Sequence, residues 1–219
     1  MPQTQSERSR QGADKRQLIL DAAIHVFADK GYHGTRISEI ARQAEIAYGL
    51  VYHYFKNKED ILDAIFFERW GGFIEAVESI AQDGRPLAER LLSIAEIILS
   101  SYRERSEWVK VLVFEIQRTQ RFADPERVKV VGQLFTVIAG MLREGQETGE
   151  LRRELDPDLA CYIYIGGLDI VVTSRVLDLI PVKGEEGEYF GQIARTVVDL
   201  FLNGMAAAPS LAGNSGGTQ

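Results

Sequence analysis

The residues best equipped to bind another molecule lie between positions 35 and 58. They combine aromatic rings that carry hydrogen-bonding groups, a glycine that lets a phosphate approach the backbone, and basic side chains. Such groups suit the phosphates and base edges of double-stranded DNA. The candidate DNA contacts are Thr35, Arg36, Ala47, Tyr48, Gly49, Tyr52, His53, Lys56 and Lys58.

The spacing of apolar residues predicts two short helices joined by a tight turn around these candidates. Ile37, Ile40 and Ala41 recur at helical spacing, and Thr35 is the expected N-cap of their helix. A turn then leads to a second helix over 48–54. This layout is typical of a helix-turn-helix unit, whose second helix enters the major groove.

Within this unit each candidate has an expected role. Tyr48 and Gly49 begin the second helix, nearest the base edges, and Arg36 is expected to contact a base or a phosphate. A core position is the alternative for each tyrosine, because aromatic clusters are typical of helical cores. The remaining polar candidates are expected to position phosphates: Tyr52, His53, Lys56, Lys58 and Thr35.

The charge distribution favours contact with DNA through the N-terminal part alone. The whole chain has a net charge of −7, but residues 1–58 carry nine basic and six acidic side chains. Their net charge of +3 leaves −10 for the remainder. An acidic body repels DNA, whereas a basic segment attracts it.

The chain is expected to form two helical domains between disordered tails over 1–13 and 206–219. An amphipathic helix over 14–30 braces the helix-turn-helix, which gives a three-helix DNA-binding domain over 14–57. A larger helical domain over 58–205 is expected to bind ligand and to dimerise. No segment alternates like a strand, so the chain is predicted to be all-α. The predicted helices of the larger domain span 58–81, 87–102, 106–121, 125–148, 159–179 and 188–205.

Capping residues mark several of these boundaries. Asn57, Asp124 and Asp156 are expected to N-cap the helices that follow, and proline comes directly after both aspartates. Gly31 and Gly149 are expected to end the helices before them.

The last two helices carry more apolar surface than a monomer needs. The helix over 159–179 is apolar on more than one side, and Gly166 and Gly167 allow a neighbouring helix to approach closely. We expect half of a four-helix interface between two copies; the alternative is a central core helix in a monomer. Two-fold symmetry would place two recognition helices about one DNA turn apart on a near-palindromic operator. The expected interface residues are Ile163, Gly167, Ile170, Tyr189, Ile193, Val197 and Phe201.

Two spaced patterns in the N-terminal part are specific: Thr35-x-x-x-x-Ile40-Ala41, and Gly49-x-x-Tyr52-x-Tyr54-Phe55-x-x-Lys58-Glu59-x-Ile61-Leu62. They resemble the signature of TetR-type transcriptional regulators. That resemblance implies an all-α repressor that a small molecule releases from DNA. Two positions depart from the signature, because the family usually has glycine in place of Glu45 and a small hydroxyl residue in place of Ala47. The recognition helix is therefore expected to lack its usual side-chain N-cap.

The larger domain supplies aromatic residues for an apolar cavity and arginines for an anionic group. The alternatives are plain core for the aromatic residues and ordinary surface charge for the arginines. Arg105 and Arg127 belong to the same arginine cluster. The candidate ligand-binding residues are Phe66, Trp70, Arg103, Phe114, Gln117, Arg118, Arg121, Phe135, Tyr164 and Asp169.

The stretch 31–76, and Gly145-Gln146-x-x-Gly149-Glu150 before an apolar helix, resemble the fatty-acid-metabolism regulators of the TetR family. That resemblance implies long-chain acyl-CoA as the effector, with its acyl chain in the cavity and its phosphates on the arginines. We expect the effector to shift the helix over 58–81 and to widen the separation of the two DNA-binding heads. The alternatives are a drug-like hydrophobic effector, and a helical ligand-binding module that has lost DNA binding.

The sequence does not support catalysis, a metal or cofactor, or membrane insertion. His25, His33 and His53 lie far apart and lack metal-ligand spacing, and no nucleophile or phosphate-binding motif is present. No apolar run is expected to span a membrane, and residues 1–12 lack the apolar core of a signal peptide. A cytoplasmic location is therefore expected. The single cysteine, Cys161, is expected to be buried.

Overall fold

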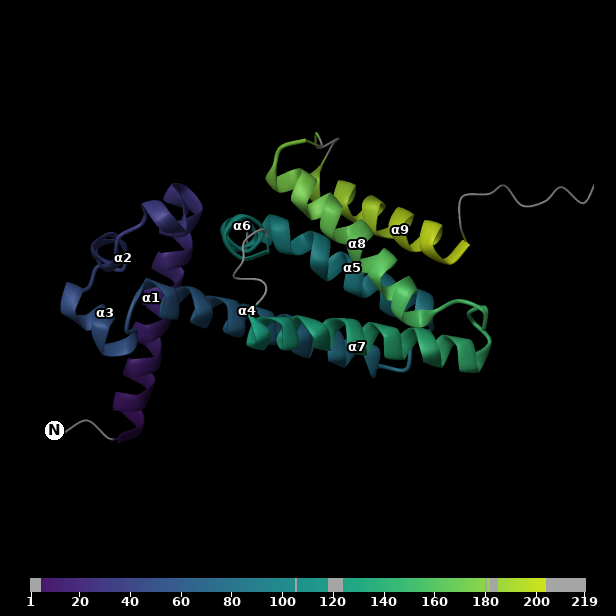
Figure 1. The fold of residues 1–219 in the computed structure, drawn as a ribbon, viewed down its shortest axis with the longest axis horizontal. Helices are drawn as coiled ribbons and strands as arrows, with labels where there is room; N and C mark the ends of the chain where they lie inside the picture. Colours follow the sequence, from purple (N-terminus) through teal and green to yellow (C-terminus); the bar gives the residue numbers. More distant parts are fainter. Residues whose placement is uncertain (1–4, 105, 118–123, 180, 182–184, 204–219) are drawn as a thin grey trace, which may run out of the picture.

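A computed structural model describes residues 5–104, 106–117, 124–179, 181 and 185–203, which contain helices and no strand. The all-α prediction is therefore confirmed. Figure 1 shows α1, α2 and α3 at one end and α4 extending from them into the remaining helices. The helices are α1 (Gln5–Gly34), α2 (Ile37–Gln43), α3 (Tyr48–Tyr54), α4 (Lys58–Ala81), α5 (Leu87–Glu104), α6 (Ser106–Val111), the π-helix η1 (Leu112–Gln117), α7 (Pro125–Thr148), α8 (Pro157–Val176) and α9 (Glu186–Asn203).

Helices α1, α2 and α3 form a small head whose core is closed by the first turns of α4. Phe27 of α1, Ile40 of α2, Val51 of α3 and Ile61 of α4 are each at most 2% exposed. Burial of such a side chain stabilises the folded state by roughly 1.5–3 kcal/mol. Because α4 also continues into the body, the head and the body share one rigid element.

Helix α1 starts earlier than the sequence pattern indicated. It begins at Gln5, so residues 5–13 are helical and the prediction of a disordered tail there is wrong. The glutamate, arginine and glutamine residues of this segment have favourable helix propensities, which outweigh its low hydrophobicity. At the other end, Gly31 interrupts the helix as predicted, with a left-handed φ of +72°.

The turn between α2 and α3 contains Glu45 in a left-handed conformation, with a φ of +55°. A residue with a Cβ atom is destabilised by about 1 kcal/mol or more in this conformation, whereas glycine is not. This geometry explains why glycine suits the turn of this helix-turn-helix. Ala47 is the N-cap residue of helix α3 and provides no side-chain hydrogen bond, as expected.

Helix α5 is central to the body, since it packs against α4, α6, α7, α8 and α9. Leu91, Ile94 and Leu99 on this helix are fully buried. Helix α4 runs beside α7 on one side of the body (Figure 1), and α7 packs in turn against α8. The body is therefore two layers of helices whose apolar faces meet around α5.

Four of the predicted caps are confirmed. Asp124 and Asp156 each accept two backbone N–H groups at the starts of α7 and α8, and Asn57 accepts the N–H of Asp60 at the start of α4. Gly149 ends α7 with a left-handed φ of +83°. These contacts satisfy backbone donors and acceptors that a helix leaves open at its ends.

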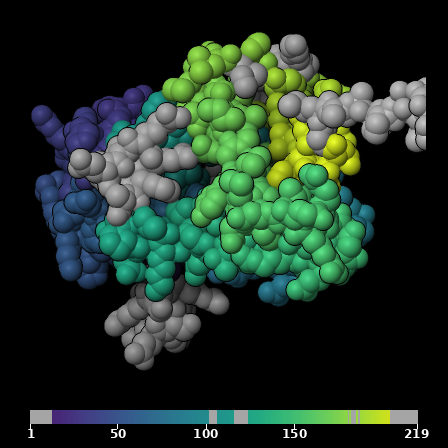
Figure 2. Space-filling model, turned by 45° about the vertical axis from the view of Figure 1, so that its right-hand side comes forward, coloured from purple at the N-terminus to yellow at the C-terminus, as the bar shows by residue number. Residues whose placement is uncertain are grey.

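Helix α8 lies between α7 and α9 on one face of the body (Figure 2) and buries only one of its sides. Tyr164 and Leu168 are buried, whereas Ile163 and Ile170 are 62% and 57% exposed. Among the described residues, α8 alone is long and apolar enough to cross a membrane by length and composition, contrary to the expectation that no run would qualify. Core helices of soluble proteins meet the same criterion, so this is weak support for a membrane span.

Cys161 of α8 is buried, as predicted. Its sulfur lies 3.6 Å from the carbonyl oxygen of Phe135, and burial raises the pKa of the thiol to about 11. Because the thiolate is the reactive form of cysteine, this group is chemically inert at neutral pH.

Replacing Glu45 with glycine is expected to stabilise the protein by about 1 kcal/mol, because the left-handed position no longer carries a Cβ atom. The Tm of the Glu45→Gly variant in a thermal melt should rise by about 2–4 °C. The Glu45→Gln variant keeps the strained backbone, so its Tm should stay near that of the wild type. An unchanged Tm for the glycine variant would show that the left-handed turn is not strained.

Candidate DNA-binding face and effector pocket

The outer face of α3 presents two linked phenols. Tyr48 and Tyr52 are 53% and 46% exposed although both are large aromatic residues. Their hydroxyl oxygens are hydrogen-bonded at 3.0 Å, and their rings meet edge to face. The hydrogen bond with Tyr48 raises the pKa of Tyr52. The two hydroxyls form one polar tip on the exposed face of α3, which suits a base or a phosphate.

Most other DNA-binding candidates are also exposed. Arg36 lies at the start of α2, where its backbone N–H donates to Glu39 at 2.9 Å and its side chain stays on the surface. Glu45, in the turn between α2 and α3, is also exposed. The candidates that the structure leaves exposed are Arg36, Ala47, Tyr48, Gly49, Tyr52, His53 and Lys56.

The DNA contact predicted for Thr35 is wrong, because this side chain points into the protein. It is 3% exposed, and its hydroxyl donates to the carbonyl oxygen of Gly31 at 2.8 Å. Arg36, not Thr35, occupies the N-cap position of α2. The break in α1 leaves the Gly31 carbonyl without a helical donor, and the hydroxyl satisfies it. The structure therefore contradicts both the capping role and the phosphate contact predicted for this side chain.

Lys58 is a second correction. Its ammonium group donates to the backbone carbonyl oxygens of Tyr32 and Thr35, the second at 2.8 Å, and lies 4.3 Å from the centre of the Tyr32 ring. Both carbonyls belong to the turn that follows the break in α1. Lys58 thus fastens the first turn of α4 to α1, in place of the predicted phosphate contact. Lys56 is the exposed lysine of the pair.

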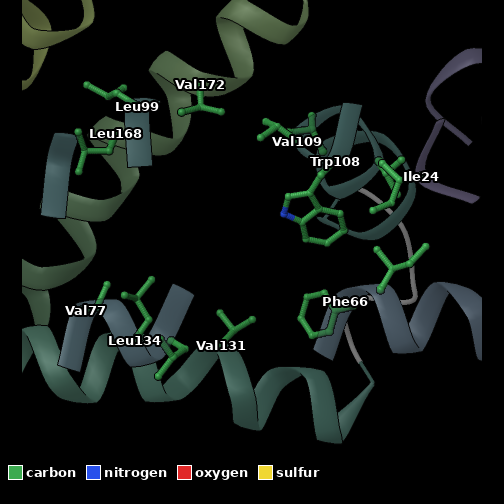
Figure 3. Packing of buried hydrophobic residues seen from close by; sticks show 14 of the residues in the cluster. Ile24, Phe66, Val77, Leu99, Trp108, Val109, Val131, Leu134, Leu168 and Val172 are labelled. Carbon is green, nitrogen blue, oxygen red and sulfur yellow. The ribbon is translucent and has the colours of Figure 1, made fainter. Parts of the chain in front are cut away.

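A cavity of about 310 Å³ lies in the body between α4, α5, α6, η1, α7 and α8. Its walls are mainly apolar, and Figure 3 shows Trp108, Leu134 and Val172 around this space. The polar groups in its lining include Asp169 and two neighbouring serines. This volume is at the lower end of the range for small-molecule pockets.

The structure brings two of the predicted ligand-binding residues, Trp70 and Asp169, to this cavity. Phe66 and Phe135 pack into the core instead, and Phe66 stacks on Trp70 at 5.8 Å between ring centres. Tyr164 is fully buried and donates its hydroxyl to the Leu91 carbonyl. Phe66, Phe135 and Tyr164 lie on the buried faces of their helices and do not line the cavity. The structure therefore contradicts the ligand-binding role predicted for these three residues.

The remaining ligand-binding predictions fall elsewhere. Phe114 is 46% exposed and does not line the cavity. Arg127, a member of the predicted arginine cluster, is 3% exposed, pairs with Asp63 and lies over the Phe66 ring. It joins α7 to α4, so its assignment to an anion site is wrong. Arg105, Arg118 and Arg121, and the side chains of Arg103 and Gln117, lie outside the described residues.

Sequence reasoning missed several lining residues, of which Trp108 of α6 is the largest. Its position on an apolar helix face indicated core alone. Ser100 and Ser101 carried a usable signal, because they directly follow the apolar run Ile97-Ile98-Leu99. Each hydroxyl donates to a carbonyl of its own helix, as serine commonly does when it faces an apolar region.

Two side-chain contacts connect the cavity wall to the head. Glu115 of η1 accepts the backbone N–H of Tyr32 at 3.0 Å, and His25 of α1 meets Glu107 of α6 at 2.7 Å. Trp108, beside Glu107, lines the cavity. A displaced cavity wall therefore has a direct physical route to α1.

Two protein-family models match the chain, and they meet near the start of the body. Residues 19–65 match the bacterial regulatory proteins of the tetR family, and residues 66–182 match the C-terminal region of YsiA-like proteins. The chain belongs to the TetR family.

Several relatives within the TetR family concern fatty acid metabolism. The fatty acid metabolism regulator protein of Bacillus subtilis is 32% identical over 169 residues, which cover 77% of this chain and 87% of that protein. The crystal structure of FadR from Bacillus subtilis in complex with stearoyl-CoA has a TM-score of 0.76 at 29% identity, over 87% of this chain and 99% of that one. The fatty acid degradation regulator FadR from Bacillus halodurans has a TM-score of 0.78 at 29% identity, over 87% and 96% of the two chains.

Membership of the TetR family makes this protein a DNA-binding transcriptional regulator with a ligand-binding domain, and not an enzyme. The resemblance seen in the helix-turn-helix is thus confirmed. Within the described residues, no group of three or more histidine, cysteine or acidic side chains is placed to hold a metal ion.

The two lysines near the start of α4 are expected to behave differently when replaced by alanine. Lys56→Ala should weaken binding to all DNA sequences alike. The slope of the logarithm of the binding constant against the logarithm of the salt concentration (the salt slope) should fall in magnitude by about one. The Tm should be unchanged, because the Lys56 side chain is exposed. Lys58→Ala should lower stability by about 1–3 kcal/mol, because two backbone carbonyls lose their donor.

Anisotropy titrations with labelled DNA at several salt concentrations, beside thermal melts, separate these effects. The two variants remove the same charge two residues apart, so each serves as the other's control. A lower salt slope with an unchanged Tm for Lys58→Ala would show that its ammonium contacts DNA rather than the turn.

Proposed function

We propose that this TetR-family protein is a homodimeric repressor that leaves a near-palindromic operator when a long-chain acyl-CoA binds. The observation that carries the proposal is the likeness to FadR in complex with stearoyl-CoA, at 29% identity over most of both chains. The protein acts in the cytoplasm, where operator DNA and acyl-CoA occur together.

The cavity supports an acyl ligand. Its walls are apolar, and each methylene group that moves into them from water contributes about 0.8 kcal/mol. The cavity of about 310 Å³ lies at the lower end of the range for small-molecule pockets, so a long acyl chain is expected to fill it and to press on its walls. Binding then favours a body whose walls have moved.

The walls that an acyl chain would displace are tied to the head. Helix α4 contributes Trp70 and Phe73 to the cavity and carries Lys58 at its start. Helix α6 contributes Trp108, and η1 carries Glu115, which accepts from Tyr32. Movement of either wall shifts the head relative to the body, which changes the separation of the two recognition helices in a dimer.

The dimer is supported by the uncovered side of α8 and α9. Ile163 and Ile170 of α8 are mostly exposed, and a Cβ atom added at Gly166 would meet open space within its own subunit. Tyr189, Ile193 and Val197 line a shallow groove on α9. Exposed apolar area of this kind on neighbouring helices suits a symmetric four-helix contact with a second copy.

The effector is tested by anisotropy of operator DNA and by thermal melts with acyl-CoAs of graded chain length, free fatty acids and cationic drugs. Long-chain acyl-CoA is expected to release DNA and to raise the Tm, by an amount equivalent to about 2.7 kcal/mol at 100 times the Kd. Val172→Trp fills the cavity, so this variant should bind DNA and ignore acyl-CoA. A response to the drugs alone would overturn the acyl-CoA proposal and leave a drug-responsive TetR repressor.

The double variant Ile163→Asp, Ile170→Asp is expected to be monomeric, because two carboxylates cannot be buried in an apolar interface without a large cost. Sedimentation velocity should show half the wild-type mass, and operator affinity should fall because one monomer places only one recognition helix. Val128→Asp on α7, at a site 49% exposed, is the matched control and should remain a dimer. A double variant that stays dimeric would place the interface elsewhere.

A further inference from the structure

We infer that the indole N–H of Trp108 donates a hydrogen bond to the acyl carbonyl oxygen of the effector, which makes the cavity selective for acyl over alkyl ligands. The inference rests on the proposed function, because it concerns the same cavity. It adds a specificity-determining residue and the ligand atom that this residue recognises.

The position of Trp108 supports a polar contact inside an otherwise apolar cavity. The residue is 8% exposed and lines the cavity. Figure 3 shows its indole nitrogen at the edge of the ring that faces the space between Leu134 and Val172. Within the described residues this nitrogen has no hydrogen-bond partner, and it does not belong to the fully buried polar atoms, so it stays open to the cavity. An indole N–H on an apolar wall normally has an acceptor, so the acceptor is expected to come from a ligand.

Trp70 adds a second donor of the same kind from α4. Its indole nitrogen is buried and, within the described residues, has no hydrogen-bond partner. Phe66 stacks on one side of this ring, and Phe73 packs 5.5 Å away between ring centres. Neighbouring aromatic rings hold the indole in place, so it cannot easily turn toward another acceptor. Trp70 therefore leaves an unsatisfied donor behind the cavity wall on α4, and Trp108 on α6 is the donor that faces the cavity.

The other polar groups of the lining favour a neutral acceptor. Arg69 is paired with Asp21 at 2.7 Å, so its charge is already partly offset. Asp169 places an acidic side chain on the cavity, which repels a carboxylate. The carbonyl of a thioester accepts hydrogen bonds without a negative charge. A cationic amine offers donors instead, and would leave both indole groups without an acceptor.

The test compares three ligands by calorimetry on the full-length protein: palmitoyl-CoA, its thioether analogue S-hexadecyl-CoA, and free palmitate. The thioether keeps the chain and the CoA but lacks the carbonyl oxygen. The wild type is expected to bind palmitoyl-CoA about tenfold more tightly than the thioether, the effect of one hydrogen bond to a buried donor. Palmitate is expected to bind more weakly than palmitoyl-CoA.

The variants locate the donor. Trp108→Phe should lose most of the preference for palmitoyl-CoA over the thioether, because it removes the N–H and keeps an aromatic ring. Phe73→Leu changes an apolar wall of the same cavity, so it should lower both affinities and keep their ratio. Thermal melts confirm that each variant is folded.

Equal affinities of the wild type for the thioester and the thioether would overturn the inference, even if Trp108→Phe failed to fold. So would a Trp108→Phe variant that keeps the full preference. Failure of both CoA ligands to bind the wild type would instead overturn the proposed effector, and this inference with it.

Discussion

The break in helix α1 at Gly31 leaves backbone groups without helical partners, and other parts of the molecule supply those partners. Glu115 accepts the N–H of Tyr32, while Lys58 donates to the carbonyls of Tyr32 and Thr35. The hydroxyl of Thr35 donates to the carbonyl of Gly31 itself. Since an unpaired buried backbone group costs as much as a lost hydrogen bond, the head keeps this conformation only while those partners stay in place.

The elements that satisfy the break are also elements of the effector pocket. Lys58 begins α4 and Glu115 belongs to η1, and both elements contribute to the cavity wall. A hydrogen bond to a charged group contributes about 1.5–3 kcal/mol, and coupling between two sites in a protein is typically 1–3 kcal/mol. Under the proposed function, weakening one of these contacts would therefore be enough to account for release from DNA.

Local signals in the sequence predicted the helices well, because a cap acts on its own neighbours. Asp124 and Asp156 lie directly before their prolines, and the helices that they start were expected at those positions. Long-range partners were not predictable in this way. Lys58 looked like a phosphate contact because nothing nearby in the sequence reveals the carbonyls of Tyr32 and Thr35.

The cavity was less predictable than the helix-turn-helix for a similar reason. An aromatic residue on an apolar helix face has the same sequence pattern whether it fills the core, as Phe66 does, or borders a cavity, as Trp70 does. Which of the two occurs depends on how well several helices fill the space between them. That is a property of packing in three dimensions, and helical periodicity does not encode it.

Cys161 makes the chain convenient for spectroscopy. It is the single cysteine, and burial raises the pKa of its thiol to about 11, so the thiol stays protonated at neutral pH. A cysteine engineered on the exposed face of α3 would then react with a spin label or fluorophore while Cys161 stayed unmodified. Each copy in a dimer would carry one label, so the distance between the two heads can be followed in solution on an otherwise natural sequence.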